Sequence, residues 1–520
     1  MRRAALVLAL LLTTACGGGE EEPRTPPAEP PREIEVDASS TLYGFVGDTA
    51  GNPVEGVVVS DGFQCVATDA GGVYEMKRDA AAEYVCYSVP AEFKIRTGHD
   101  GYPDFYVRLD TSQQKIRQDF TLERLAGVER NFRLICIGDP QINEASHAVR
   151  FKEEAGREIR EYAASAGVPC YGITLGDHVN NKWTLFTNMV VALQPEQTGV
   201  PVFATIGNHD HEFPTADEKA ARAKYESYFG PVDYSFNRGD VHVVSMDNVI
   251  HSCKASADYE GGFTAAQYAW LKQDLSFVPK DKMVILCVHI PFRGGWGTNS
   301  AHADADKYYD EVLDLLSQYE YAAIMSAHTH SNINYIHRKN GKEIFEHVTG
   351  TTCGAWWRST VCTEGTPIGF GLYRIDGNRM EEWAYRSVRH DEQFQIRLYR
   401  ASDTFVGGAK YRFKQTGADQ IVANIWNWDP SWTVNVYEND VLSGQMTRNS
   451  DIDAWTVAYH IGLLNNTDSY RKSSDHMFHY TLKNPAAAVR VEAIDRFGNK
   501  YEQTVFTDPA EHPGDFHADF

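Results

Sequence analysis

Short hydrophobic runs separated by turn residues characterise the chain from about residue 40 to residue 125. Leu42–Val46 and Gly56–Val59 are hydrophobic runs, and Gly51-Asn52-Pro53 and Asp61-Gly62 are turn segments that follow them. Apolar, β-branched runs bounded by Gly, Asn and Asp are typical of β-hairpins. We therefore predict a small antiparallel β-sandwich over residues 39–126, and we assign it no chemistry because it holds no cluster of catalytic residue types.

The middle of the chain has a different pattern, in which continuous hydrophobic runs alternate with segments of helical composition such as Glu153–Ala164. The runs that we predict as buried strands are Phe132–Ile137, Cys170–Leu175, Val200–Ile206, Met283–Val288 and Ala322–Ser326. Buried strands that alternate with helices indicate layered α/β packing. Polar residues follow each run, at the strand ends where such sheets hold their ligands. We assign residues 127–388 to this α/β domain.

Beyond about residue 390 the pattern returns to short strands. Gln420–Ile425, Trp432–Tyr437 and Val489–Ile494 alternate or are continuously apolar, and Asp495-Arg496-Phe497-Gly498-Asn499 supplies a turn. We predict a second β-rich, sandwich-like domain over residues 389–520. A layout of three domains agrees with the length of 520 residues, since a domain commonly contains about 100–200 residues.

The first residues have the organisation of an export signal. Arg2-Arg3 precedes the apolar segment Ala4–Leu12, which is too short to span a bilayer, and small residues lead to Cys16. The segment resembles the signal of a bacterial lipoprotein, which implies a signal peptide over residues 1–16 and a membrane anchor through lipidated Cys16. The alternative is an ordinary cleaved signal peptide. Residues 17–38 are predicted to form a flexible tether, and we expect an exported protein of the cell envelope, at its periplasmic face or at the cell surface.

The charge balance narrows the possible partners. The net charge is −22, from 49 basic against 71 acidic residues, which argues against a nucleic-acid scaffold because nucleic-acid binding needs a basic surface. The same charge would repel anionic phosphate esters unless bound metal ions supplied local positive charge. Export would also permit disulfides, and Cys65 with Cys86, and Cys353 with Cys362, are near enough in sequence to pair.

Five predicted strand ends carry residues of metal-ligating type. In chain order these residues are Asp139, Asp177, Asn208-His209-Asp210, His289 and His328-Thr329-His330. Each motif is weak by itself, but their common place after a strand favours metal binding. Carboxylate, amide and imidazole groups suit Mn, Fe, Co or Zn. Two such divalent ions about 4 Å apart, with Asp177 shared between them, can clamp an in-line displacement at phosphorus.

Together these motifs resemble the calcineurin-like metallophosphoesterase family over about Arg133–Arg386. The resemblance implies a four-layer α/β/β/α core flanked by two β-sandwich-like domains, with a metal-bridging hydroxide as the nucleophile. It implies that His209 stabilises the transition state or protonates the leaving group. It assigns Asp139, Asp177 and His330 to one metal ion and Asp177, Asn208, His289 and His328 to the other. Segments that resemble a bacterial subgroup with dedicated N- and C-terminal domains are Gly354–Trp357, Gly365–Phe370, Asn424–Trp426 and Asp495–Gly498.

Two positions depart from the family pattern. Gln141 stands where the first motif usually has histidine, and an amide oxygen is a poorer ligand than imidazole for zinc or iron. We therefore expect weaker or more Mn-like occupancy of the first metal site; the alternative is that Gln141 only hydrogen-bonds a bound water. Asn180 stands where purple acid phosphatases have a tyrosine and protein phosphatases an aspartate. We expect Asn180 to orient His209 without adding a negative charge that would favour its protonated form.

Two further residues are candidates for contact with the substrate. Arg293 follows the predicted ligand His289 and can reach a phosphate oxygen, and the alternative is a solvated loop arginine. Trp356 can line a substrate cleft by stacking, or it can pack in a core or an interdomain contact.

The sequence thus predicts an exported phosphoesterase with a dinuclear metal site that hydrolyses a mono- or diester. Its substrate would be a phosphorylated small molecule or an envelope component, and the sequence leaves the substrate, the metals and the oligomeric state open. A second hypothesis is a cell-surface binding protein with a degenerate phosphoesterase domain, which only Gln141 favours. A third is adhesion through the β-domains, for which the aromatic cluster of Trp426, Trp428 and Trp432 would have to be exposed.

Overall fold

The computed structural model describes residues 32–293, 308–402, 405–406, 412–413, 417, 419–467 and 470–504. The predicted signal peptide, with Cys16, and most of the predicted tether lie outside the described residues. The chain divides into a short unit, Met1–Glu35, and a second unit, Val36–Phe520, which holds all of the helices and strands below. In the described part of the chain, no helix is both long enough and apolar enough to cross a membrane.

The N-terminal β-domain consists of two small sheets, as the hairpin pattern predicts. One sheet has the order β4-β1-β7, with β8 also paired to β1, and the other has the order β3-β2-β5-β6. The strands are β1 (Leu42–Asp48), β2 (Val58–Ser60), β3 (Cys65–Ala67), β4 (Val73–Met76), β5 (Tyr84–Tyr87), β6 (Tyr106–Arg108), β7 (Ile116–Arg117) and β8 (Phe120–Leu122). Because β1 runs parallel to both β7 and β8, the predicted purely antiparallel arrangement is wrong in this sheet.

Two larger sheets form the central domain. The first has the order β11-β10-β9-β20-β21 and the second the order β12-β13-β16-β17-β19-β18. Their strands are β9 (Asn131–Ile137), β10 (Cys170–Leu175), β11 (Val202–Thr205), β12 (Tyr234–Arg238), β13 (Val241–Ser245), β16 (Met283–Cys287), β17 (Tyr321–Ser326), β18 (Ile333–Lys339), β19 (Lys342–Val348), β20 (Gly369–Asp376) and β21 (Arg379–Ser387). All five predicted strands are present, as β9, β10, β11, β16 and β17, with ends within two residues of the predicted ones.

Alternating side chains of the six-stranded sheet build two separate hydrophobic layers. Val243 and Ile285 join the cluster that contains the five-stranded sheet, whereas their neighbours Val244 and Leu286 pack with helices α6 (Ala265–Ser276) and α7 (Tyr309–Leu316). This follows from the strand period of two, which points successive side chains to opposite faces. The six-stranded sheet therefore lies between the five-stranded sheet and a layer of helices.

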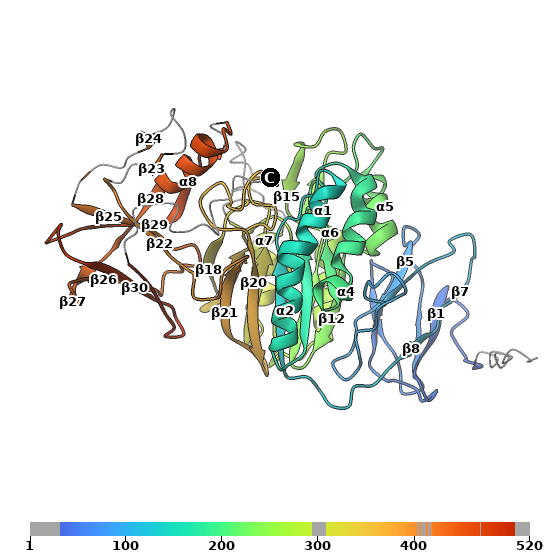
Figure 1. The fold of residues 1–520 in the computed structure, drawn as a ribbon. Helices are drawn as coiled ribbons and strands as arrows, with labels where there is room; N and C mark the ends of the chain where they lie inside the picture. The colour runs from blue at the N-terminus through green and yellow to red at the C-terminus, as the bar shows by residue number, and fades with distance from the viewer. Residues whose placement is uncertain are drawn as a thin grey trace, which may run out of the picture. The chain divides into compact units, whose positions relative to one another are not determined.

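A second helical layer covers the five-stranded sheet, so the central domain is a four-layer α/β/β/α core, as predicted. Phe151, Ile159 and Met189 pack from these helices into the same cluster as the sheet, and Figure 1 shows α1 and α2 along the sheet that carries β20 and β21. The helices of the domain are α1 (Ala145–Phe151), the π-helical η1 (Lys152–Gly156), α2 (Arg157–Ser165), the short η2 (Trp183–Leu185), α3 (Phe186–Leu193), α4 (Pro195–Thr198), α5 (Glu218–Phe229), α6 (Ala265–Ser276) and α7 (Tyr309–Leu316). A small hairpin, β14 (Val249–His251) with β15 (Tyr259–Gly261), follows β13.

The C-terminal domain is β-rich, as predicted, with sheets of the order β22-β25-β29-β28 and β27-β26-β30-β31. Its elements are β22 (Arg397–Arg400), β23 (Phe405–Val406), β24 (Arg412–Phe413), β25 (Gln420–Asn424), β26 (Thr433–Glu438), β27 (Val441–Gln445), β28 (Thr447–Ile452), α8 (Ala454–Val457), η4 (Ala458–Leu463), β29 (Ser473–Thr481), β30 (Val489–Ile494) and β31 (Lys500–Thr504). Trp426 and Trp432 are buried, and the half-buried Trp428 packs on the same core as Trp432. These tryptophans are therefore part of the domain interior, which removes the feature that favoured adhesion.

The eight described cysteines are all buried thiols, so the two suggested disulfides are not formed. Cys65 on β3 and Cys86 on β5 both lie opposite Ser60 on the strand between them. Their Cα atoms are therefore separated by two strand spacings, roughly 9–10 Å, which is beyond the reach of a disulfide. Cys353 and Cys362 each place the sulfur 3.6 Å from the hydroxyl oxygen of Thr351.

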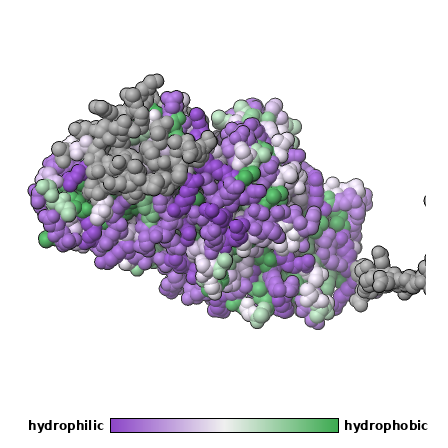
Figure 2. Space-filling view, in the orientation of Figure 1, coloured by the Kyte–Doolittle hydropathy of each residue, from purple (hydrophilic) through white to green (hydrophobic). Residues whose placement is uncertain are grey.

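The surface in Figure 2 is largely hydrophilic, with hydrophobic residues scattered over it. The large hydrophobic residues that are exposed in the described part of the chain are Val128, Val149, Val191, Phe277, Val441 and Leu442. Apart from the neighbours Val441 and Leu442 on β27, these residues are separate in the sequence, and single exposed hydrophobic residues are normal at a protein surface.

Candidate metal centre

The carboxyl ends of five strands bring the predicted metal ligands together. β9, β10 and β11 are mutually parallel, and so are β16 and β17. Parallel strands deliver the residues that follow them to one edge of a sheet. The buried residues that come two or three positions after these strands are Asp139, Asp177, Asn208, His289 and His328.

Two groups of buried side chains have the composition of metal sites. Asp177, His289 and His328 form one group, and Asp139, Asp177 and His330 form the other. In each group the potential ligand atoms all lie within 4.8 Å of one another. Asp177 belongs to both groups, as the sequence predicts for a carboxylate shared by two ions.

Two glycines allow these strand ends to approach each other. A Cβ atom on Gly176 would lie 2.4 Å from Nδ1 of His289, and one on Gly207 would lie 2.2 Å from the backbone nitrogen of Asp177. Gly176 also has a φ of +93°, which favours glycine. The glycine before Asp177 and the glycine before Asn208 are therefore required by the packing of the ligand loops.

The ligand loops are conformationally strained. Five of the predicted ligands have φ in the left-handed region, which residues other than glycine rarely adopt. Their φ values are 35° at Asp139, 37° at Gln141, 52° at Asp177, 66° at His328 and 56° at His330. Strain of this kind persists only where the surrounding structure enforces it, and it clusters at functional sites.

The geometry of the group around His289 fits one metal ion. Nε2 of His289 lies 2.9 Å from Oδ1 of Asn208, 3.1 Å from Nδ1 of His328 and 3.4 Å from Oδ1 of Asp177. Nδ1 of His289 donates to the carbonyl of Leu175 at 2.7 Å, so Nε2 is the nitrogen that faces the group. Burial opposes protonation of His289, but Asp177 raises its pKa to about 9, so an ion that binds here would displace a proton from Nε2. Ligand atoms about 2.0–2.2 Å from one cation lie at comparable mutual separations. These four side chains therefore fit a shared ion.

The group around Asp139 contains three buried polar atoms without a hydrogen-bond partner. They are Oδ1 of Asp139, Oε1 of Gln141 and Nδ1 of His330. Nε2 of Gln141 donates to Oδ2 of Asp177 at 3.3 Å, so its amide lies against the shared carboxylate. Buried polar atoms are almost always satisfied, and a cation would satisfy the two oxygens. The residues present therefore fit a metal at this position, and whether Gln141 would join them as a ligand stays a prediction.

Burial and mutual charge set the protonation of the ligands. Burial raises the pKa of Asp139 well above its usual value. Burial would raise the pKa of Asp177 too, but the nearby His289 lowers it below its usual value. Burial lowers the pKa of His328, and it lowers that of His330 to about 3. Both imidazoles are therefore neutral at pH 7, which is the form that binds metal ions.

The partner of the predicted catalytic histidine differs from the sequence prediction. Nδ1 of the half-buried His209 lies 2.9 Å from Oδ1 of Asn181, not against Asn180. Asn181 has a φ of 56°, which turns its side chain toward His209, whereas the Asn180 nitrogen donates to the Ile142 carbonyl. The backbone nitrogen of His209 donates to Oδ1 of Asp177 at 2.8 Å. The expected uncharged partner of His209 is thus present one position later.

The two predicted substrate contacts have different surroundings. The Trp356 ring lies 4.8 Å from the imidazole of His330, centroid to centroid, so it borders the metal site. The exposed Arg293 places its guanidinium 5.7 Å from the ring of Tyr335, and its role in phosphate binding stays a prediction. Sequence reasoning missed Tyr259, whose hydroxyl lies 3.3 Å from Nε2 of His328. No local motif around Tyr259 could have indicated this contact.

Buried polar side chains hold the ligand loops in place. Oδ1 of Asp210 accepts from the backbone nitrogens of His178 and Val179 at 2.9 and 3.2 Å, and Oδ2 accepts from that of Gly207 at 3.0 Å. Oδ1 of Asn248 accepts from the backbone nitrogen of His289 at 3.1 Å. Asp210 thus ties the loop that carries Asp177 to the loop that carries Asn208, and Asn248 fixes the loop that carries His289.

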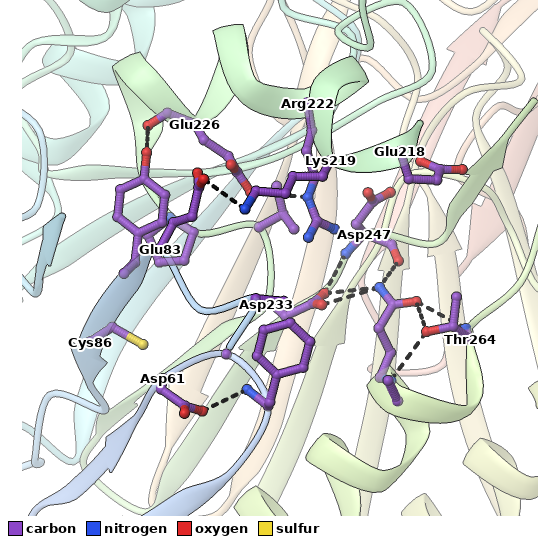
Figure 3. Close-up of a pocket in the computed structure, with 18 of the residues that line it drawn as sticks. Asp61, Glu83, Cys86, Glu218, Lys219, Arg222, Glu226, Asp233, Asp247 and Thr264 are labelled. Atoms are coloured by element: carbon purple, nitrogen blue, oxygen red, sulfur yellow. Dashed lines mark hydrogen bonds and ion pairs between the residues drawn. The ribbon is translucent and has the colours of Figure 1, made fainter. Parts of the chain in front are cut away.

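The pair of His211 and Asp247 further supports the loop that carries Asn208. Asp247 also lines a separate cavity of about 260 Å³ between the N-terminal β-domain and the core (Figure 3). Nε2 of His211 lies 3.1 Å from Oδ2 of Asp247, which lines this cavity, and Nδ1 lies 2.9 Å from the Gly207 carbonyl. Both partners accept, so both ring nitrogens donate and His211 is an imidazolium. Burial opposes this charge, yet Asp247 raises the pKa of His211 above its usual value.

Comparison with protein families accounts for all three domains. Residues 132–332 match calcineurin-like phosphoesterase, residues 40–125 match the N terminal of calcineurin-like phosphoesterase, and residues 346–501 match its C terminal. The four-layer fold and the two ligand groups agree with these matches. The chain belongs to the calcineurin-like phosphoesterase family and carries both companion domains of that family.

Individual relatives are similar over part of the chain. Purple acid phosphatase 23 and purple acid phosphatase 18 of Arabidopsis thaliana are 26% identical over 181 residues and 25% identical over 182 residues. These matches cover 32% and 33% of this chain but only 36% and 38% of the two relatives. A 5'-nucleotidase from Candida albicans is a structural neighbour with 12% identity and a TM-score of 0.30, over 51% of this chain and 52% of that chain.

We predict that Asp247→Asn loosens the loop that carries Asn208, because His211 loses its charged partner. A buried hydrogen bond to a charged group contributes about 1.5–3 kcal/mol, and the free energy of unfolding in urea should fall by that order. The matched control is Glu83→Gln, which lines the same cavity and pairs with Lys219 at 2.8 Å. Equal stability of Asp247→Asn and the control would show that this contact does not support the loop.

Proposed function

We propose that this protein hydrolyses a phosphate ester at a dinuclear metal centre. The observation that carries the proposal is the pair of buried ligand groups that share Asp177. Membership of the calcineurin-like phosphoesterase family supports the same chemistry. The names of the similar purple acid phosphatases favour a phosphorylated compound as the substrate. We propose a phosphorylated small molecule or an envelope component, as either a mono- or a diester.

The proposed metal ligands follow from the two groups of side chains. Asp139, Gln141, Asp177 and His330 would hold the first ion, and Asp177, Asn208, His289 and His328 would hold the second. Two divalent ions of Mn, Fe, Zn or Co, when bound, would polarise the phosphoryl oxygens and supply a hydroxide near neutral pH. Gln141 would favour an oxygen-preferring ion at the first position.

His209 is the proposed catalytic side chain beside the metal ligands. Asn181 holds its Nδ1 at 2.9 Å, and this contact orients the ring so that Nε2 can act on the leaving group. The hydrogen bond from its backbone to Asp177 ties the position of His209 to that of the shared ligand. Trp356, beside His330, is proposed to line the substrate cleft, and Arg293 to contact a phosphate oxygen.

We also propose that the protein is exported and anchored to the bacterial cell envelope through a lipid on Cys16. The support is the sequence of residues 1–16, with its basic start, short apolar segment and cysteine, followed by the Gly-, Glu- and Pro-rich segment 17–38. The phosphoesterase would then act on compounds outside the cytoplasm.

The alternative function is a cell-surface binding protein with a degenerate phosphoesterase domain. Gln141 is the feature that favours it, because it replaces a stronger ligand at the first metal position. Against this alternative, the other predicted ligands are present in the two groups. Several of them also have strained backbone conformations, which cluster at functional sites. Turnover by the purified protein separates the two hypotheses.

We expect the purified protein, reloaded with Mn²⁺, Zn²⁺ or Fe²⁺, to hydrolyse generic aryl phosphate mono- or diesters. Asp177→Ala should reduce the rate to background because it removes the shared ligand, and His209→Ala should reduce kcat by about 10²–10⁴. The surface variant Arg338→Gln, whose side chain is 75% exposed, should retain full activity. Activity that survives Asp177→Ala would refute the two-metal mechanism, and metal binding without any turnover would favour the binding protein.

The position of the His209 partner gives a second test. In Asn181→Asp, a carboxylate beside His209 should stabilise the protonated imidazole, and the basic limb of the pH–rate profile should move to higher pH. The matched control is the neighbouring change Asn180→Asp, which should move this limb less. A larger shift for Asn180→Asp would restore the original prediction, and identical profiles for both variants and the unmodified protein would exclude His209 as the proton donor.

A further inference from the structure

A lysine of the C-terminal domain lies against Trp356, the ring that borders the metal site. Nζ of Lys472 is 5.6 Å from the centroid of the Trp356 ring, and the same ring lies 4.8 Å from the His330 imidazole. Lys472 precedes β29, more than 100 positions along the chain from Trp356. The C-terminal domain thus places a basic side chain one aromatic ring away from the first ligand group.

Packing fixes the segment that carries this lysine. The ring of Tyr470 meets Trp356 edge to face at 5.6 Å, and Tyr470 is buried in a cluster with Ala355 and Ile461. The carbonyl of Tyr470 lies 3.4 Å from Nδ1 of His460. Contacts from both the central and the C-terminal domain therefore hold the position of Lys472.

The backbone conformation of Trp356 and Trp357 supports a functional role for this segment. Trp356 has a φ of 50° and Trp357 a φ of 66°, and such values are strained for bulky side chains. Trp357 is buried and donates from its indole nitrogen to the Pro140 carbonyl at 2.8 Å. Trp356 remains half-buried, and its ring contacts both His330 and Lys472.

The Lys472 side chain lies in a largely desolvated position. Burial lowers the pKa of Lys472 to about 7, although the nearby Glu364 opposes this shift. A bound anion would therefore favour the protonated form of this side chain. The chain as a whole carries a net charge of −22. A local positive charge at this position would therefore help to bind an anionic phosphate ester.

A phosphomonoester differs from a diester in charge. Its phosphoryl group carries about −1.5 to −2 at pH 7, since its second pKa is near 6, whereas a diester carries a single negative charge. A lysine ammonium binds a phosphate oxygen as a point charge with three donors. A cation beyond the metal ions therefore favours the more highly charged ester.

We propose that Lys472 is a substrate-binding residue that holds the second negative charge of a phosphomonoester. The C-terminal domain then completes the active site and makes the enzyme prefer monoesters to diesters. This inference rests on the proposed function and names the substrate class for the same site.

The test compares Lys472→Met, which keeps most of the unbranched side chain but removes the amine, with Lys472→Arg, which keeps a positive charge. Substrates are para-nitrophenyl phosphate and bis-para-nitrophenyl phosphate, which share a leaving group, with Mn²⁺-loaded protein. Loss of one charged hydrogen bond corresponds to about a tenfold or larger change. Lys472→Met should raise KM for the monoester by about this factor, with kcat and the diester parameters within about twofold, and Lys472→Arg should restore most of the loss.

A binding measurement makes the test independent of turnover. Calorimetric titration of the Mn²⁺-loaded protein with inorganic phosphate should show about tenfold weaker affinity in Lys472→Met. The matched control is Lys483→Met, an exposed lysine of the same domain that hydrogen-bonds the Ser443 carbonyl, and it should bind phosphate normally. Metal content and circular dichroism verify the fold, and Lys472→Gln replaces the methionine variant if that variant fails to fold.

The outcomes separate the two proposals. Unchanged phosphate affinity and unchanged monoester KM in Lys472→Met would overturn the role of Lys472. Equal losses for the monoester and the diester would overturn the selectivity. Absence of hydrolysis in the unmodified protein, with phosphate binding that still depends on Lys472, would overturn the proposed function and support the anion site.

Discussion

The burial of the Asp177 carboxylate is the constraint on which the centre of this protein depends. Asp177 lies 1% exposed between two ligand groups. Its Oδ1 accepts from the His209 backbone, and its Oδ2 accepts from Gln141. A buried carboxylate is expensive unless it is paired with cations or donors. The histidines, the strained loops and the close glycines are all arranged around this one group.

The surrounding fold serves to keep that carboxylate in place. Two sheets provide five strand ends at one site, and Asp210, Asn248 and the His211–Asp247 pair fasten the loops between them. The N-terminal β-domain closes over the cavity that Asp247 lines, and the C-terminal domain reaches Trp356 through Tyr470. Each companion domain therefore contacts a residue that lies next to the metal ligands. These contacts give a physical reason why the three domains occur in one chain.

The parts that the sequence predicts well are those governed by local pattern. Continuous hydrophobic runs that end in polar residues locate β9, β10, β11, β16 and β17, because buried parallel strands need that pattern. The ligands follow from the same strand ends.

The parts that the sequence misses depend on three-dimensional detail. Asn181 rather than Asn180 meets His209 because of one left-handed residue, and Tyr259 and Lys472 approach the site from distant segments. Cys65 and Cys86 look close in sequence, but an intervening strand separates them.

The most direct test of the shared carboxylate is to count bound metal ions. Metal analysis by mass spectrometry, after equilibration with Mn²⁺ and removal of excess ions, should find two ions per chain in the unmodified protein. His330→Ala should retain one ion, because the group around His289 stays intact, whereas Asp177→Asn should fall below one because both groups lose a ligand. A single ion in the unmodified protein, or two ions retained in Asp177→Asn, would contradict the account.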